Sequence, residues 1–117
     1  MKRAINFYRT FCGCPFENFL DSLPAKTARK ITWLLSAVQE TNIITESYFT
    51  KINFDENIWE CRIHSQDSVL RILCFFYNED IIILCAGLLL KFSDLMKEQE
   101  ERAIEYKKDF LIQKGIV

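Results

Sequence analysis

The middle of the chain contains four short segments rich in β-branched and aromatic residues, and they restrict its fold more than any other feature. The segments cover residues 48–53, 58–64, 68–77 and 80–86. Short polar stretches at 55–57, 65–67 and 78–80 separate them. Separators of this length suit tight turns, whereas parallel strands need crossover connections of about a dozen residues or more. The sequence therefore predicts a four-stranded antiparallel meander.

The order of residues within two neighbouring segments predicts a sheet with two different faces. Strand side chains alternate between faces, so Glu60, Arg62 and His64 project to one side and the apolar residues between them project to the other. A second arginine, Arg71, lies in the next segment. We therefore expect one apolar face and one polar, basic face.

Apolar residues recur at helical spacing on both sides of these strands. The predicted helices cover residues 15–23, 25–40 and 92–110. Pro15 suits the first position of a helix, and a short strand is predicted within residues 4–10. The predicted fold is α+β, with an N-terminal helical hairpin packed on a small antiparallel β-sheet and a C-terminal helix, in a single domain spanning 1–117.

The 117 residues are half hydrophobic and 14% aromatic, which is enough apolar material for one compact domain. The longest apolar run, 81–90, is shorter than the ~20 residues that a membrane-spanning helix needs. The first residues lack the pattern of a signal peptide, so we expect a cytoplasmic protein without membrane contact. The net charge of −1 attracts no nucleic acid as a whole, so RNA binding requires a local basic patch.

The five cysteines, an odd number in mostly apolar surroundings, are expected to be core residues without disulfide bonds. Cys12 and Cys14 flank Gly13 and are close enough to hold a metal or to undergo redox chemistry together. No second pair and no C-x2-C spacing completes a tetrahedral site. We therefore expect a loop before a helix here, and we expect no metal or cofactor.

Four phrases follow one another in a distinctive order: FENFLDSLPAKTARKITWLL, YFTKI, IWECRI and VLRILCFFY. Together they resemble the RelE/HigB superfamily of type II toxins, specifically its phage-derived, host-killing (HigB-like) branch, over residues 16–103. The resemblance implies a RelE-like fold and a ribosome-associated mRNA endoribonuclease (mRNA interferase) that inhibits translation without a metal. It also implies neutralisation by an antitoxin protein, usually a helix-turn-helix protein.

Individual residues match the motifs of that family. Glu60 and Arg62 match an E-x-R strand, and Arg71 matches the arginine of Y-R-I. Lys51 matches a basic residue of the preceding strand, and Lys91 matches the second lysine of a K-K pair. The loop around that pair departs from the family pattern at four positions: Ala86 replaces histidine, Leu90 the first lysine, Phe92 threonine and Met96 proline.

RNA cleavage by an attacking 2′-hydroxyl needs a base, cations that stabilise charge on the phosphate, and an acid for the leaving 5′-oxygen. We predict Arg71, Arg62 and Lys91 as catalytic residues, because arginine donates two hydrogen bonds to phosphate and stays charged, while a lysine can assist proton transfer. Lys51 and His64 are predicted to bind RNA. The expected partners of the toxin, besides its antitoxin, are messenger RNA and the ribosome.

Each of these assignments has a structural alternative. The two arginines can pair with carboxylates across the sheet, the candidates being Glu60, Asp67 and Glu79. His64 can be an exposed turn residue. Under these alternatives the same side chains stabilise the fold and take no part in RNA binding or cleavage.

Two functions remain open at this point. One is an active toxin held in check by an antitoxin, and the other is a degenerate toxin-like domain that acts as a protein-binding module. The segment 87–96 separates them, because its apolar residues suit protein contact better than phosphate contact. Self-association would use Leu88, Leu89, Leu90 and Phe92. Alternatively, the segment packs on the sheet and leaves a site of Lys51, Arg62 and Arg71.

Overall fold

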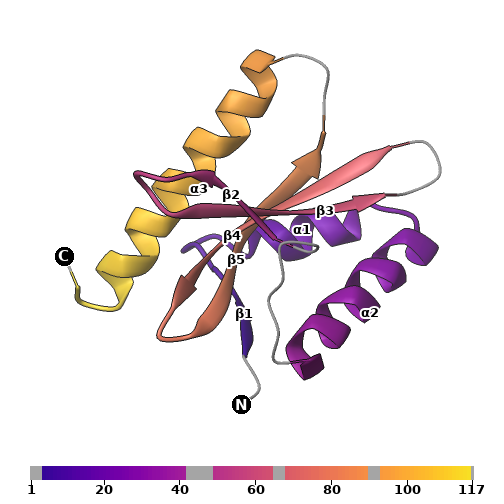
Figure 1. Cartoon of the computed structure of the whole chain (residues 1–117), viewed down its shortest axis with the longest axis horizontal. Coiled ribbons are helices and arrows are strands. Elements are labelled where there is room, and N and C mark those ends of the chain that lie inside the picture. Colours follow the sequence, from indigo (N-terminus) through magenta and orange to yellow (C-terminus); the bar gives the residue numbers. More distant parts are fainter. Residues whose placement is uncertain (1–3, 42–48, 65–67, 90–92, 117) are drawn as a thin grey trace.

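The computed structural model of the chain describes residues 4–41, 49–64, 68–89 and 93–116, which fold around one sheet (Figure 1). In chain order the elements are β1 (Ile5–Phe7), α1 (Pro15–Asp21), α2 (Ala25–Thr41), β2 (Thr50–Asn53), β3 (Ile58–His64), β4 (Val69–Tyr77), β5 (Asp80–Leu88) and α3 (Ser93–Gln113). The predicted α+β class and the C-terminal helix are confirmed.

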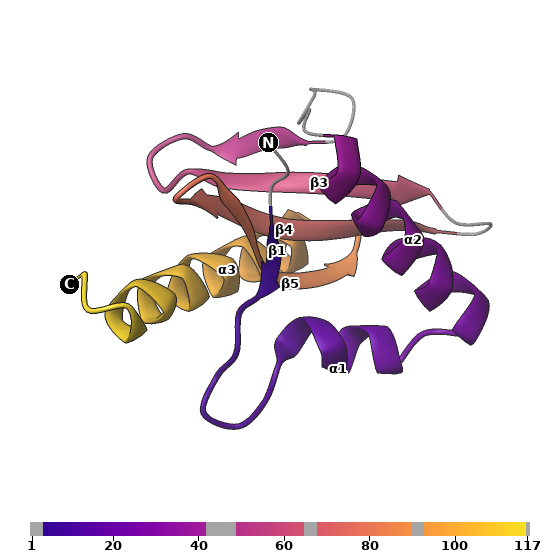
Figure 2. The same cartoon turned by 90° about the horizontal axis from the view of Figure 1, so that it is seen from below.

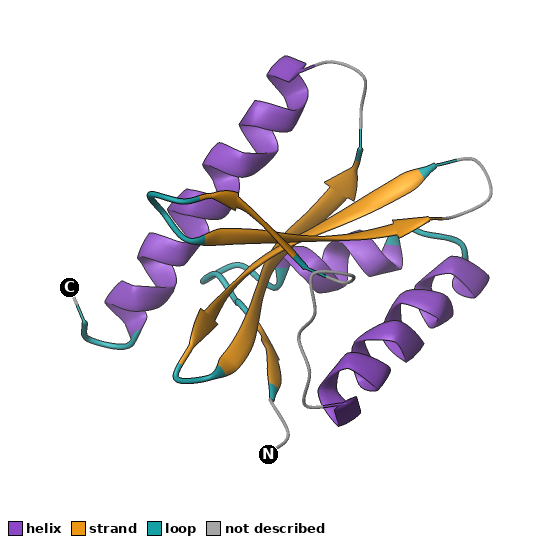
Figure 3. Ribbon diagram, viewed as in Figure 1, coloured by secondary structure: helices purple, strands orange, loops and turns teal. Residues whose placement is uncertain are grey.

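Strands β2 to β5 form the predicted antiparallel meander, in which each strand pairs with the next (Figure 3). The turn between β4 and β5 has positive φ at both Asn78 and Glu79, at 50° and 71°. This is the backbone geometry of a two-residue hairpin turn whose twist matches that of the flanking strands. The short polar separators therefore predicted this part of the fold correctly.

The first strand breaks the antiparallel pattern. β1 pairs in parallel with β5, with Ile5 opposite Ile81 and Phe7 opposite Ile83, so the sheet order is β1-β5-β4-β3-β2. The expectation of a wholly antiparallel sheet is wrong at this edge. A three-residue strand contains too little pattern to identify a partner near the other end of the chain.

The helices α1 and α2 pack against one face of the sheet, but they do not form the predicted hairpin. Pro15 occupies the first turn of α1, as expected. Figures 1 and 2 show the two helices diverging from their short connection. Phe16 of α1 and both Ile31 and Leu35 of α2 join the same apolar cluster as the strands. Each helix therefore buries its apolar side in the sheet cluster without aligning with the other helix.

The helix α3 covers the opposite face and forms a second apolar cluster. Ala103 and Phe110 of α3 pack with Leu73 and Phe75 of β4, in agreement with the predicted apolar side of this helix. Figure 1 shows α2 and α3 on opposite sides of the twisted sheet. Of the helices in the described ranges, none is long and apolar enough to cross a membrane.

Four of the five cysteines are core residues, as expected. Cys14, Cys61, Cys74 and Cys85 are buried and unbonded, whereas Cys12 is exposed. Cys12 and Cys14 therefore lie in different environments. Across the part of the chain that the structure describes, no group of three histidine, cysteine or acidic residues could hold a metal ion.

Candidate functional site

Polar residues on the α3 side of the sheet are aligned across three strands. Arg62 in β3 lies directly opposite Arg71 in β4, and Arg71 lies opposite Gly87 in β5. Glu60 is two residues from Arg62, on the same face, as the alternation predicts. Two cations placed directly opposite each other repel, so this register needs a nearby counter-ion.

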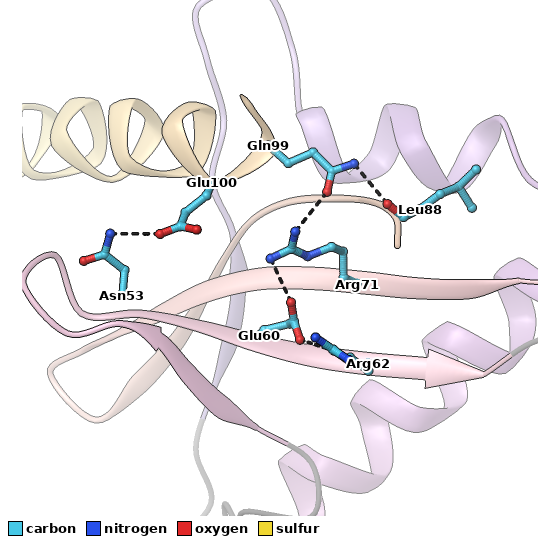
Figure 4. A network of polar contacts seen from close by, with 7 residues as sticks. All are labelled: Asn53, Glu60, Arg62, Arg71, Leu88, Gln99 and Glu100. Carbon is cyan, nitrogen blue, oxygen red and sulfur yellow. Dashed lines mark hydrogen bonds and ion pairs between the residues drawn. The ribbon is translucent and has the colours of Figure 1, made fainter. Parts of the chain in front are cut away.

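Glu60 supplies that counter-ion to both arginines. Its Oε2 lies 2.7 Å from Arg71 Nη2, and its Oε1 accepts a hydrogen bond from Arg62 Nε (Figure 4). The side chains of Glu60 and Arg71 are only 2% and 3% exposed, while that of Arg62 is 51% exposed. The Glu60 carboxylate therefore connects the buried Arg71 to the half-exposed Arg62. This confirms the structural alternative in which the arginines pair with Glu60.

The helix α3 adds Gln99 to this network. Gln99 Oε1 accepts a long hydrogen bond of 3.4 Å from Arg71 Nη1, and its Nε2 donates one of 3.1 Å to the backbone carbonyl oxygen of Leu88 (Figure 4). Arg71 Nε is buried and has no hydrogen-bond partner within the described ranges. An unpaired buried donor costs about 1–3 kcal/mol and is uncommon in native folds, so it needs an explanation such as a functional role.

An open pocket of about 300 Å³ lies beside the ion pair. It is lined by Ile52, Glu60, Arg62, Arg71, Met96, Lys97 and Glu100. The lining includes three cationic side chains and two carboxylates, so its charge is positive although that of the whole chain is not. Glu100 accepts a hydrogen bond of 2.9 Å from Asn53 Nδ2, which connects α3 to β2 (Figure 4). The pocket is therefore a candidate for the local basic patch that RNA binding would require.

The helix α3 covers much of the face that was predicted to be polar and basic. Arg71 is buried beneath the helix, and the exposed cations are Arg62 at the edge of the pocket and Lys97 on α3. Strand alternation assigns residues to a face but does not reveal which helix covers that face. The predicted apolar side of α3 was the available signal that pointed to this cover.

Two pocket residues, Lys97 and Glu100, were missing from the predicted site, as was Gln99, which contacts Arg71. All three come from the first half of α3, next to the predicted apolar residue Met96. Their neighbours in the pocket come from β2, β3 and β4, so the site depends on a tertiary contact. The helical spacing of Met96 and Gln99 was the one sequence signal that could have located them.

Two other predicted site residues lie away from the pocket. Lys51 is opposite Trp59 in the ladder of β2 and β3, and its Nζ lies 5.8 Å from a ring centroid of Trp59, toward the other face of the sheet. His64 is exposed at the end of β3, and its backbone oxygen accepts a hydrogen bond of 2.6 Å from Lys30 Nζ. The structure brings Arg62 and Arg71 together and leaves Lys51 and His64 outside.

The apolar segment after β5 is described only in part. Leu88 is 43% exposed and Leu89 is half-buried. Lys91, together with Leu90 and Phe92, lies outside the described residues. The hypotheses of self-association and of packing on the sheet both depend on these residues and therefore stay predictions.

The buried thiol of Cys85 lies near the positive charge of Arg71, and both its burial and that charge affect its pKa. Burial raises the pKa of Cys85 to about 12, and the positive charges of Arg102 and Arg71 act in the opposite direction. A thiol with this pKa stays protonated near neutral pH and is a poor nucleophile. The candidates for chemistry here are therefore the charged groups that line the pocket, among them the Glu60 carboxylate and the cations of Arg62 and Lys97.

Comparison with known protein families matches residues 18–105 to the family described as Phage derived protein Gp49-like (DUF891). The matched range covers α2, β2 to β5 and the part of α3 that contains Gln99. A search of curated proteins found no match.

Proposed function

The chain belongs to the phage-derived Gp49-like family, a toxin-like family of the RelE/HigB type, and from this premise we propose that it is the toxin of a type II toxin–antitoxin system. We assign it to the HigB-like, host-killing branch. Its proposed activity is metal-independent cleavage of messenger RNA on the ribosome, which inhibits translation. In this family an antitoxin is the general partner.

The observation that carries the proposal is the Glu60 carboxylate held between two arginines beside a positively charged pocket. In the proposed reaction the 2′-oxygen of the RNA attacks the adjacent phosphorus and the bond to the 5′-oxygen breaks. Glu60 accepts the proton of the 2′-hydroxyl, and Arg62 donates hydrogen bonds to the phosphate oxygens. The products are a 2′,3′-cyclic phosphate and a free 5′-hydroxyl.

The remaining roles follow from charge and position. Arg71 orients Glu60 through their ion pair, and its unpaired Nε is one more donor at the site. Lys91 is assigned the proton for the leaving 5′-oxygen. Lys51 and His64 lie outside the pocket and are assigned to RNA farther from the cleaved bond.

A second candidate function is a toxin-like domain that binds a protein partner without cleaving RNA. The observation that favours it is the burial of Arg71, whose Nη1 and Nη2 are already engaged by Gln99 and Glu60. Leu88 at the end of β5 and Leu95 in the first turn of α3, each 43% exposed, would suit such a partner.

Induced expression of the chain, with growth and messenger RNA integrity as readouts, tests the proposal. Arg62→Ala is the informative variant because this side chain is half exposed and its loss leaves the buried Glu60 paired with Arg71. We expect RNA cleavage to fall on the order of a hundredfold, as for loss of one donor to a reacting phosphate. Co-expression of any small protein encoded beside the chain should restore growth.

Arg9→Ala is the matched control. Arg9 also forms a surface ion pair with a carboxylate, Glu17, at 2.7 Å, but it does not line the pocket beside Glu60. Cleavage should be unchanged in this variant. Normal growth and intact messages at verified soluble expression of the unaltered chain would contradict the nuclease and favour the protein-binding module.

A further inference from the structure

Arg62, Arg71 and Gly87 lie side by side across β3, β4 and β5. A side chain of α3 occupies the space beside Gly87. Gly87 lies opposite Arg71 in the ladder of β4 and β5. A Cβ atom on Gly87 would lie 2.8 Å from Gln99 Nε2, which is shorter than real Cβ contacts, and 3.1 Å from Gln99 Cδ, which is tighter than most of them, so the flexible end of Gln99 would have to move. The absence of a side chain at position 87 is therefore what admits the Gln99 amide.

The two contacts of that amide determine which way it faces. The backbone oxygen of Leu88 can only accept, so it requires the Nε2 of Gln99 at 3.1 Å. The guanidinium of Arg71 can only donate, so it requires Oε1. Rotating the amide by half a turn would place donor against donor and oxygen against oxygen. Leu88 thus directs the amide oxygen of Gln99 toward Arg71.

Arg71 has few other restraints at this end of its side chain. Glu60 contacts Nη2, Gln99 contacts Nη1, and Nε has no hydrogen-bond partner in the part of the chain that the structure describes. If Gln99 were removed, the guanidinium would keep its ion pair but lose the second point that fixes its plane. An arginine held at a single nitrogen can turn about its Cζ–Nε bond.

We propose that Gln99 is a positioning residue that fixes the plane of the Arg71 guanidinium, and that Gly87 is required because it leaves room for the Gln99 amide. The catalytic consequence rests on the proposed function, since Arg71 orients the Glu60 carboxylate that takes up the proton. The structural part stands without that function, because it concerns contacts within the fold.

The structural part is tested by nuclear magnetic resonance of the arginine side chains in the full chain. The two Nη groups of Arg71 should give separate nitrogen signals in the unaltered protein, because rotation is restrained at both. Gln99→Met keeps the length of the side chain and removes both hydrogen bonds, so the two signals should merge. Gly87→Ala should have the same effect, because the new methyl group displaces the amide.

Gln113→Met is the matched control. Gln113 is also on α3 and donates to a strand-side backbone oxygen, that of Arg9 at 3.1 Å, but it lies at the far end of the helix. The Arg71 signals should stay separate in this variant. The half-exposed Arg62 provides an internal reference, and thermal unfolding verifies that each variant is folded. Separate Arg71 signals in both Gln99→Met and Gly87→Ala would overturn the proposal.

The catalytic part is tested by RNA cleavage with the same three variants. We expect kcat to fall about tenfold in Gln99→Met and Gly87→Ala, the effect of losing one charge-assisted hydrogen bond, with KM unchanged. Gln113→Met should cleave as the unaltered chain does. Unchanged kcat with merged signals would refute the catalytic consequence, whereas no cleavage by the unaltered chain would refute the proposed function and leave the signals to decide the positioning.

Discussion

The two faces of the sheet are built from the same strands but have different interiors. On the α1 and α2 side, the buried strand residues are apolar, among them Cys61, Ile63 and Ile72. On the α3 side, apolar residues such as Leu73 share the interior with a buried ion pair of Glu60 and Arg71. The difference arises only from which residues alternate along β3 and β4.

The difference between the two faces indicates which of them contributes less to the stability of the fold. Apolar burial stabilises a fold by roughly 25 cal/mol per Å². A buried ion pair, by comparison, gains little net stability because both ions lose their hydration, and well-packed apolar residues often replace such a pair without loss. The face with the ion pair, the unpaired Arg71 Nε and the charged pocket is therefore the face on which function is the better explanation.

The largest effect should come from breaking the pair on one side only. Arg71→Ala leaves the buried Glu60 carboxylate with the half-exposed Arg62 as its remaining counter-ion, and we expect the free energy of unfolding to fall by about 3 kcal/mol, the lower end of the range for breaking a buried pair. Urea denaturation measures this loss. The control is the double replacement Glu60→Leu with Arg71→Met, which removes both charges at similar volume. It should restore stability to near that of the unaltered chain or above it, while RNA cleavage is lost.

Failure of this pattern would change the interpretation of the α3 face. If Arg71→Ala lowers the free energy of unfolding by less than about 1 kcal/mol, the value typical of a surface pair, the ion pair is hydrated. The interiors of the two faces would then differ less in polarity than the burial of Glu60 and Arg71 indicates. If the double replacement is as unstable as the single one, packing and not charge determines the loss.

An intermediate effect should appear on the apolar face at alkaline pH. Burial, and secondarily the charge of Glu60, raise the pKa of Cys61 from 9.0 to about 11. Because the folded pKa lies above the unfolded one, the stabilisation is complete below pH 9.0 and is lost as pH rises toward 11. The loss attributable to this thiol is about 2–3 kcal/mol, at 1.36 kcal/mol per pKa unit.

Urea denaturation on both sides of this pH window, for the unaltered chain and for Cys61→Ala, isolates the contribution of that thiol. The difference in unfolding free energy between the two proteins should shrink or reverse as pH rises. If this difference in unfolding free energy stays constant with pH, the thiol of Cys61 is accessible to water. The interior of the apolar face would then be more hydrated than its burial indicates.

The smallest effect should come from removing one methylene from the apolar face. Ile72 is fully buried there, so Ile72→Val should lower the unfolding free energy by about 0.5–1.5 kcal/mol. RNA cleavage per folded molecule should not change, because the side chain points away from the pocket. A marked loss of cleavage at full folding would show that the two faces are coupled through β4.

The elements of the fold were predictable where the pattern was long or the turns were short. The meander from β2 to β5 and the apolar side of α3 follow from alternation and helical spacing, and Pro15 marks the start of α1. The partner of β1 was not predictable, since three residues carry no register information. Nor was the divergence of α1 and α2, because a short connection allows more than one angle.

The site was predicted in part for a similar physical reason. Alternation placed Arg62 with Glu60, and pairing of adjacent strands brought Arg71 beside them. Lys51 lies opposite Trp59 and not opposite Glu60, and the sequence patterns of β2 and β3 do not reveal this register. The contribution of Gln99 requires knowing that α3 lies over β5, a contact between elements distant in the sequence.

The parallel pairing of β1 with β5 also determines when the molecule can be completed during synthesis. Chains emerge from the ribosome with the N-terminus first, but Ile5 cannot find its place in the sheet until Ile81 has been made. Gln99 and the rest of α3 follow later still. The site beneath α3 can therefore be completed only after this helix has been made, so Glu60 and Arg71 are translated well before the residue that we propose positions Arg71.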